Sequence, residues 1–500
     1  MVWNRGAKAA AALAVCMAGV MAAAGCSTGS GGEEESGGGT LRAAFAGGSS
    51  ETLNYFQGPT ALDYVRARLV HAPLCELDPA AADGVSYGVV ASIDMADDLS
   101  AYTLHLRDDV RFTDGSDLDS ADVLYSLRAA TLLDGLPFTL LAARNFDLDA
   151  ASAPDEATVV LPTLAPIADG RELICQSMLA IQDGTTEFTP ETPSSGPFTI
   201  AAFEPGRSTL LERNPDYYGR APASEAIELV SIADGTARVN ALRQGQVDYI
   251  SGIAPAQAQS LGDADGITVA TGELPYASYL QFTMNTASTP FDDPLVREAF
   301  KLAVDREQIV ENVYFGHAFV GNDLPALGFP SYDTGIEQRA YDPDRARELL
   351  AEAGAEGMSV ELTAGPELAG MVETATLIVE DLQAIGVDAT LRELPPGQLF
   401  ADYAAYLELP FRVGFNPPAM FEPNYTGGVF PEVDALVATA RNAPTPEQRL
   451  EASHQAQELL WAAGDQIGPV FVPNISAAAE GVSGVRELQF PDLSQASIAD

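Results

Sequence analysis

Alternating apolar and polar residues, followed by a capping pattern, predict a strand, turn and helix unit in the first quarter of the chain. Tyr102, Leu104 and Leu106 alternate with polar neighbours, which is typical of a strand with one buried face. Asp119 then precedes a run whose apolar residues recur at helical spacing, and Asp122 stands where a capping box needs its acid. We expect a helix to begin directly after Asp119.

The second half of the chain alternates predicted helices and strands. Asp293 and Asp342 each precede a proline and a helical apolar pattern, so both are expected to cap helices. Residues 358–362 and 387–391 have the pattern of strands, and they flank a predicted helix over 372–385. Strand, helix, strand order favours a parallel sheet with helical crossovers, so an α/β lobe is expected here.

The start of the chain has the pattern of an export signal. Two basic residues precede residues 9–24, a mostly apolar stretch shorter than the ~20 residues that span a bilayer. Ala-Ala-Gly-Cys ending at Cys26 resembles a lipobox, with alanine in place of the more usual leucine. We expect residues 1–25 to be a lipoprotein signal peptide, Cys26 to be lipidated and residues 26–39 to be a flexible tether. Soluble secretion after conventional cleavage is the alternative.

Composition indicates a large chain with a strongly acidic surface. Its 500 residues, 47% of them hydrophobic, are enough for a large core and two or more domains. The formal net charge of −45 at pH 7 disfavours nucleic acid and anionic lipid as partners. A cationic or neutral solute is easier to attract than an anion, unless a local arginine reverses the balance at short range.

Two cysteines remain after Cys26. Cys75 and Cys175 are an even pair in an expected oxidising compartment, so they form either a disulfide or two buried free thiols.

Catalytic and metal-binding patterns are not evident in the sequence. It has no Gly-X-Ser-X-Gly elbow, no phosphate-binding loop and no His-Glu-X-X-His motif. The histidines are scattered, at His71, His105, His317 and His454. We therefore expect neither an enzyme nor a cofactor, and no metal site built from protein side chains.

Several segments together resemble one family. The run that begins at Tyr102 and contains Phe-Thr-Asp-Gly-Ser, with residues 118–127 after it, resembles the signature of the peptide/nickel-type extracellular solute-binding proteins, family 5. Residues 211–218, 237–248 and 279–285 resemble further segments of that family in the same order. The resemblance covers roughly residues 40–490.

This resemblance implies an α/β fold of the two-lobed periplasmic-binding-protein kind, with crossing hinge strands and an extra subdomain in the first lobe. Lobe I is expected over residues 40–285, with the inserted subdomain at about 76–190 and the hinge near 279–285. Lobe II is expected over 286–474, and residues 475–500 return to lobe I.

The function implied is that of the substrate-binding component of an ABC importer, which closes two lobes around an extracellular solute and delivers it to a permease and its ATPase. The protein is expected to be a monomer, anchored by lipid to the outer face of the cell membrane. A di- or oligopeptide is the leading solute. An oligosaccharide, opine or metal chelate on the same scaffold is the alternative, and an extracellular sensor or enzyme is a remote one.

By position in the family, two segments are expected to line the cleft, together with one acid. Peptide binders of the family typically carry Gly-Trp followed by an aspartate that pairs with the ligand's amino group, whereas this chain has Pro417 and Pro418 after Asn416. An unpaired buried ammonium is costly, so another acid such as Glu422 is needed for a peptide, and Arg412 is the expected partner of a carboxylate. The expected ligand-binding residues are Phe56, Gln57, Gly58, Pro59, Arg412, Gly414, Phe415, Asn416 and Glu422.

Overall fold

The structure, a computed structural model, describes residues 39–58, 60–78, 81, 84–135, 140–176, 178–262, 264–425 and 427–499. They belong to one compact unit, Gly37–Asp500. The expected signal peptide, Cys26 and nearly all of the expected tether lie outside the described residues, as does Pro59. In these ranges no helix has the length and apolar character needed to cross a membrane.

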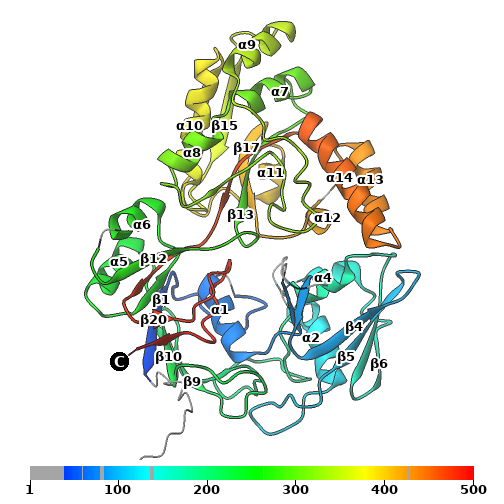
Figure 1. The fold of residues 1–500 in the computed structure, drawn as a ribbon, viewed down its shortest axis with the longest axis vertical. Helices are drawn as coiled ribbons and strands as arrows, with labels where there is room; N and C mark the ends of the chain where they lie inside the picture. Colours follow the sequence, from blue (N-terminus) through cyan, green and yellow to red (C-terminus); the bar gives the residue numbers. More distant parts are fainter. Residues whose placement is uncertain are drawn as a thin grey trace, which may run out of the picture. The chain divides into compact units, whose positions relative to one another are not determined.

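A large mixed sheet joins distant parts of the chain (Figure 1). Its described strands, in spatial order, are β12 (Ile267–Thr271), β19 (Ile475–Ala479), β11 (Tyr249–Ser251), β1 (Thr40–Phe45), β10 (Ala226–Ser231), β9 (Ser208–Arg213) and β8 (Phe198–Glu204). β1 alternates faces: Leu41 and Phe45 pack in one core with helix α1 (Ala61–Val70), while Ala44 packs with α5 (Gly235–Arg243) and α6 (Pro255–Gly262). Period-two alternation therefore lets helices cover both faces. A short pair, β20 (Val482–Ser483) and β21 (Ser497–Ile498), lies near the C-terminus.

A smaller antiparallel sheet carries the signature segment. Its described strands, in order, are β4 (Val90–Met95), β5 (Ala101–Leu106), β7 (Thr158–Pro162) and β6 (Ser152–Asp155). The predicted strand is confirmed as β5, with Tyr102 and Leu104 fully buried. The capping box is also confirmed. The Asp119 side chain caps α2 (Ser120–Leu132), and the Asp122 carboxylate accepts a hydrogen bond from the Asp119 backbone amide. We call residues 75–181, which also hold β2 (Cys75–Leu77), β3 (Val85–Tyr87), α3 (Leu141–Asn145) and α4 (Gly170–Cys175), the subdomain.

A second large sheet lies in the other half of the chain. Its described strands, in order, are β14 (Phe319–Val320), β18 (Gln466–Val472), β13 (Ser278–Met284), β17 (Phe411–Asn416), β15 (Ser359–Ala364) and β16 (Asp388–Glu393). The predicted strand, helix, strand unit is confirmed as β15, α10 (Met371–Ala384) and β16, and its two strands pair in parallel. The other helices of this half are α7 (Pro294–Ala303), α8 (Arg306–Asn312), α9 (Pro343–Glu352), α11 (Tyr403–Leu407), α12 (Phe421–Asn424), α13 (Pro431–Arg441) and α14 (Pro446–Ala463).

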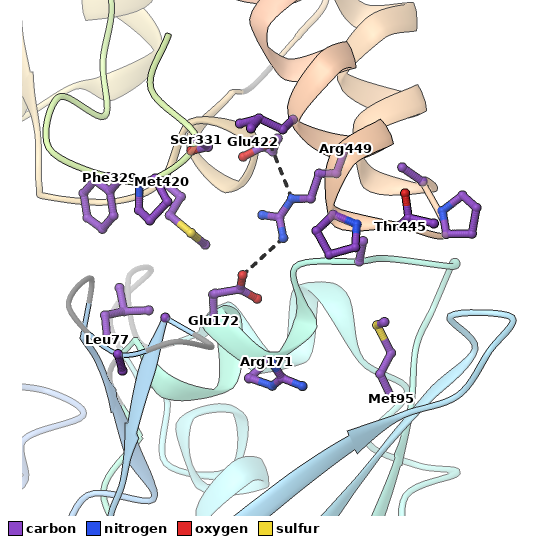
Figure 2. Close-up of a pocket in the computed structure, with 18 of the residues that line it drawn as sticks. Leu77, Met95, Arg171, Glu172, Phe329, Ser331, Met420, Glu422, Thr445 and Arg449 are labelled. Carbon is purple, nitrogen blue, oxygen red and sulfur yellow. Dashed lines mark hydrogen bonds and ion pairs between the residues drawn. The ribbon is translucent and has the colours of Figure 1, made fainter. Parts of the chain in front are cut away.

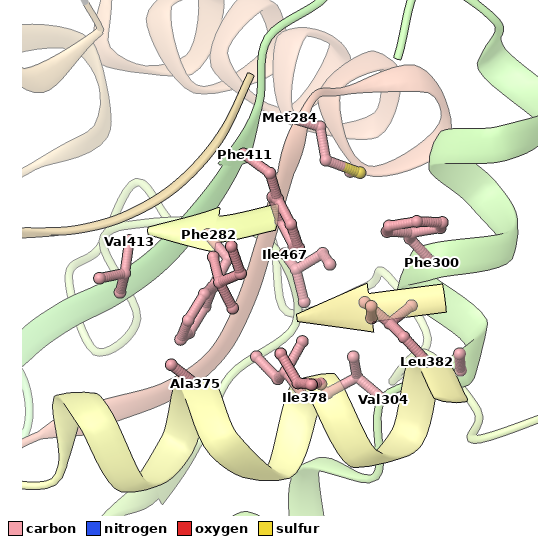
Figure 3. Packing of buried hydrophobic residues seen from close by; sticks show 14 of the residues in the cluster. Phe282, Met284, Phe300, Val304, Ala375, Ile378, Leu382, Phe411, Val413 and Ile467 are labelled. Carbon is pink, nitrogen blue, oxygen red and sulfur yellow. The ribbon is translucent and has the colours of Figure 1, made fainter. Parts of the chain in front are cut away.

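The core of this half packs its sheet against helices that include α7, α9 and α10. Figure 3 shows Ala375, Ile378 and Leu382 pointing from α10 towards the strands, where they meet residues such as Phe282 and Val413. These positions recur at the helical spacing that predicted the helix. Asp293 and Asp342 cap α7 and α9, each with proline in the first turn, as predicted.

The chain crosses between the two large sheets twice. The first crossing lies between β12 and β13, and the second between β18 and β19. β12 pairs with β19 in one sheet and β13 with β18 in the other, so the same two stretches of chain run antiparallel in both. β13, over which the hinge is expected, therefore lies in the second sheet, directly after the first crossing. The expected domain bounds stay predictions.

A disulfide joins Cys75 and Cys175, which the sequence left open. It fastens β2 to the end of α4 across a sequence separation of 100 residues. Because a cross-link of this span restricts the unfolded chain strongly, replacing both cysteines by serine should lower the free energy of unfolding by about 4 kcal/mol. Reductant should shift the wild type by a similar amount in denaturant titrations, and should leave the variant unchanged.

Counting the free thiols tests the disulfide directly. Two titratable thiols in the unreduced, denatured chain from residue 27 onward would contradict the disulfide.

Candidate functional site

A cavity of about 460 Å³ lies between the subdomain and the second half of the chain (Figure 2). Its walls are mostly apolar, with a small number of charged side chains. The subdomain contributes Leu77, Ala81, Gly84, Met95, Tyr102, Ala168, Arg171 and Glu172, and the second half contributes Phe329, Pro330, Ser331, Met420, Glu422, Ala443, Pro444, Thr445, Pro446, Arg449 and Leu450. This volume and this mixture are typical of a small-molecule site.

The start of α4 is fixed by the signature strand. Tyr102 donates its hydroxyl hydrogen to the Ile167 carbonyl at 2.7 Å and accepts a hydrogen bond from the Gly170 amide at 3.1 Å. A Cβ at Gly170 would lie only 2.2 Å from the Tyr102 ring, so this close contact requires glycine. The buried Tyr102 thus sets where α4 begins, and so where Glu172 enters the cavity.

Arg449 lies between two carboxylates that come from different halves of the chain. Its Nη1 donates to Glu172 Oε1 at 3.1 Å, and its Nε lies 3.5 Å from Glu422 Oε1. Figure 2 marks both contacts. Burial alone would lower the pKa of the Arg449 guanidinium, but Glu172, Glu422 and Asp169 together raise it above the ordinary arginine value. Arg449 therefore stays charged.

Glu422 is a fully buried carboxylate that lines the cavity. Neither of its oxygens has a hydrogen-bond partner within the described part of the chain, and its contact with Arg449 is longer than a strong hydrogen bond. A buried carboxylate of this kind favours a further positive group or donor beside it.

Arg171 adds a positive group to the same wall. Its Nη2 donates to the Ile93 carbonyl at 3.3 Å, its Nε is buried without a partner, and it forms no ion pair with a described residue. Its guanidinium therefore has capacity left for an acceptor in the cavity.

The opposite wall is held by a buried ionic cluster. Asp323 accepts hydrogen bonds from Arg306 Nη2 and Arg339 Nε, both at 2.6 Å, and from the Gly468 amide at 3.0 Å. Burial would raise the pKa of Asp323, but the two arginines keep it below the ordinary aspartate value. The cluster fixes the segment that carries Phe329 into the cavity.

The first expected cleft segment lies away from the cavity. Phe56 is buried in a cluster between α1 and α2 and stacks on Tyr55 at 4.1 Å between ring centroids. Gln57 is exposed and donates its amide to the Leu133 carbonyl, while Gly58 is buried against Asp63. None of these three lines the cavity, and their binding role stays a prediction.

The second expected segment is the strand β17, next to β13. Arg412 donates to the Leu409 carbonyl at 3.1 Å and lies over the Tyr406 ring, so its guanidinium is used locally. Gly414 pairs with Gln281, and Asn416 donates to the Gln281 side chain.

Phe415 packs partly buried on the core of this half, with its ring 6.0 Å from that of Phe400. Of the nine expected residues, the structure brings Glu422 to the cavity, while the two segments form no hydrogen bond with each other among the described residues.

Sequence reasoning missed the other charged residues of the site. Arg171 and Glu172 precede Cys175 by a few positions, and Arg449 lies in the first half of α14, but no motif marks them. Their meeting depends on contacts between distant segments. Within the described ranges no group of histidine, cysteine or acidic side chains is arranged to hold a metal ion.

Asp169, directly before α4, is a buried acid beside this site. Both carboxylate oxygens lack a hydrogen-bond partner in the described structure, and burial raises the pKa of Asp169 although Arg449 and Arg441 oppose the shift. Between the unfolded pKa of about 4 and the raised folded pKa, the folded state binds more protons than the unfolded state, so the contribution of this group to stability is lost as pH rises through the folded pKa.

Replacing Asp169 by asparagine should remove that dependence. We expect the melting temperature of Asp169→Asn to rise relative to the wild type as pH increases from 4 to 8, measured by scanning calorimetry. A difference that is constant across this range would contradict the buried, proton-binding carboxyl.

Comparison with known proteins identifies the family of this chain. The family model "Bacterial extracellular solute-binding proteins, family 5 Middle" matches residues 84–431. The glutathione-binding protein GsiB of Salmonella typhimurium is 24% identical over 426 residues, covering 78% of this chain and 81% of that protein.

Two solved structures share the fold. The Helicobacter pylori DppA, solved with the peptide STSA, has a TM-score of 0.72 at 17% identity and covers 93% of this chain and 98% of its own. CtaP of Listeria monocytogenes, an ABC transporter substrate-binding protein, has a TM-score of 0.79 at 19% identity and covers 93% and 100%. The two-lobed α/β fold of periplasmic binding proteins is thereby confirmed, and the chain belongs to the bacterial extracellular solute-binding proteins of family 5.

Proposed function

We propose that this chain captures a short peptide in the cavity between its lobes and delivers it to the permease and ATPase of an ABC importer. Binding proteins of this family act outside the cytoplasm and work with such importers. The proposal is one of binding and delivery, without a catalytic step. Closure around the solute stabilises the form that the importer recognises, because the solute contacts both lobes.

The observation that carries the peptide assignment is the buried Glu422 carboxylate on the cavity wall. A peptide's ammonium would supply the charge-assisted donor that this acid lacks. Glu422 thus takes the role of the aspartate that is missing after Gly414 and Phe415. Arg171 is the proposed partner of a peptide carboxylate, in place of Arg412.

The apolar walls suit the rest of a short peptide. Leu77, Met95 and Met420 line the cavity from both sides, and methionine side chains adapt to ligands of different shape. A relative is named for glutathione binding and a neighbour was solved with a peptide, which supports this solute class.

We further propose that Cys26 carries the lipid anchor. Its position at the end of the apolar leader supports this, and a lipidated cysteine would keep a monomeric receptor at the outer face of the membrane.

Removing the charge of Glu422 should weaken peptide binding. We expect Glu422→Gln to bind a di- or tripeptide with a free amino group at least about thirtyfold more weakly, because a buried charge pair is lost. Calorimetric titrations of a peptide panel measure this change. Glu432→Gln, at an exposed acid on α13, is the matched control and should bind as the wild type does.

Acetylated peptides test whether the amino group of the ligand is the partner of Glu422. Peptides with a blocked amino group should bind the wild type weakly and should lose little further affinity in Glu422→Gln. Equal affinity of wild type and variant for free peptides, or no peptide binding at all, would refute the proposal.

A further inference from the structure

The contact between Arg449 and Glu172 joins the subdomain to the second lobe. Arg449 is on α14 and Glu172 on α4, 277 residues apart in sequence, and their side chains are 14% and 19% exposed. A pair this well shielded is screened less by salt than a surface pair. A few residues away, the Ala168 amide donates to the Arg441 carbonyl at 2.7 Å, so two polar contacts cross at the same place.

The helices that carry Glu172 and Arg449 are each fixed by contacts within their own part of the chain. The α4 helix is fixed by the Tyr102 contact at one end and by the Cys75–Cys175 disulfide at the other. The α14 helix begins at a Thr445 side-chain cap followed by Pro446, which places Arg449 in its first two turns. Because little side-chain and backbone freedom remains to be lost, the ion pair retains more of its Coulomb energy than a flexible surface pair does.

The guanidinium also has the right shape for two partners. Arg449 reaches Glu172 of the subdomain and Glu422 of its own lobe through different nitrogens. A planar fork can satisfy two carboxylates at once, whereas a lysine ammonium is a single compact charge. The acid proposed to receive the solute's ammonium is thus already in contact with a positive group of the protein.

We propose that Arg449 is a latch: by bridging Glu422 to Glu172 it draws the two lobes together while the cavity holds no solute. A fraction of the empty receptors is then closed, and an entering cationic group competes with Arg449 for Glu422. This inference rests on the proposed function only in taking the cavity as the solute site.

The test measures lobe closure in the absence of any solute. Spin labels are placed on Asp149→Cys in the subdomain and Glu458→Cys on α14, both exposed positions, in the chain from residue 27 onward, which contains the whole compact unit. The native cysteines of that chain are joined in the disulfide and do not react. Bound solute is removed by unfolding and refolding, emptiness is verified by native mass spectrometry, and distances are measured by pulsed electron paramagnetic resonance.

Glu172→Gln should lower the ratio of short to long distances roughly fivefold. This is the change in an equilibrium constant that the loss of one well-formed ion pair produces. Arg449→Lys should lower it similarly, because the ammonium cannot bridge both acids. Glu348→Gln, which removes an ion pair of 2.9 Å within one lobe, should leave the ratio unchanged. Because the pair is shielded but not fully buried, added salt should shift the wild type modestly towards long distances and should have less effect on Glu172→Gln.

The latch is overturned if Glu172→Gln gives the same distances and the same salt response as the wild type. This outcome is informative even if the Arg449 variant fails to fold, because Glu172 is partly exposed and its replacement is isosteric. Since no solute is used, a failed peptide titration would refute the peptide assignment and leave this result standing, and the reverse also holds.

Discussion

The antiparallel pairing of two crossing segments is the constraint on which the rest of the structure depends. β12 and β19 pair in the large sheet, and the same two stretches of chain pair again as β13 and β18 in the second sheet. Between the sheets, the Gly272 amide donates to the Asn474 carbonyl at 2.8 Å, so the two crossings stay in register. Each lobe is therefore tied to the other by a paired connection.

Burial leaves the acids of the cavity short of partners. Glu422 and Asp169 are fully buried, and neither has hydrogen-bond partners within the described part of the chain. Arg449 is the positive group that faces both of these acids and Glu172 as well. Such an arrangement stabilises a protein less than apolar packing would, because desolvation offsets much of the Coulomb attraction.

Local patterns were sufficient to predict much of the fold. The alternation around Tyr102, the capping box at Asp119 and the proline-led helices after Asp293 and Asp342 are properties of short segments, and the structure confirms each of them. The parallel pair β15 and β16 followed from the order of the predicted elements. These predictions succeeded because the interactions that determine such elements are mostly between residues close together in the sequence.

The site was harder to predict because its charged residues meet only in three dimensions. Glu172 and Arg449 are distant in sequence, and long-range contacts such as the disulfide, the Tyr102 contact and the two crossings bring them together. Glu422 was expected because a family position lacked its acid, which is a chemical argument rather than a pattern. Phe56 and Phe415 were expected by position, and the structure packs both among apolar neighbours.

The most direct test of the central claim is native mass spectrometry of the chain from residue 27 onward, purified from its own host without refolding. The account predicts that short peptides with free amino termini are released from the protein, and that Glu422→Gln purified in the same way retains far less of them. A single bound mass that is not a peptide, such as a sugar, an opine or a metal chelate, would contradict the peptide assignment while leaving the family unchanged.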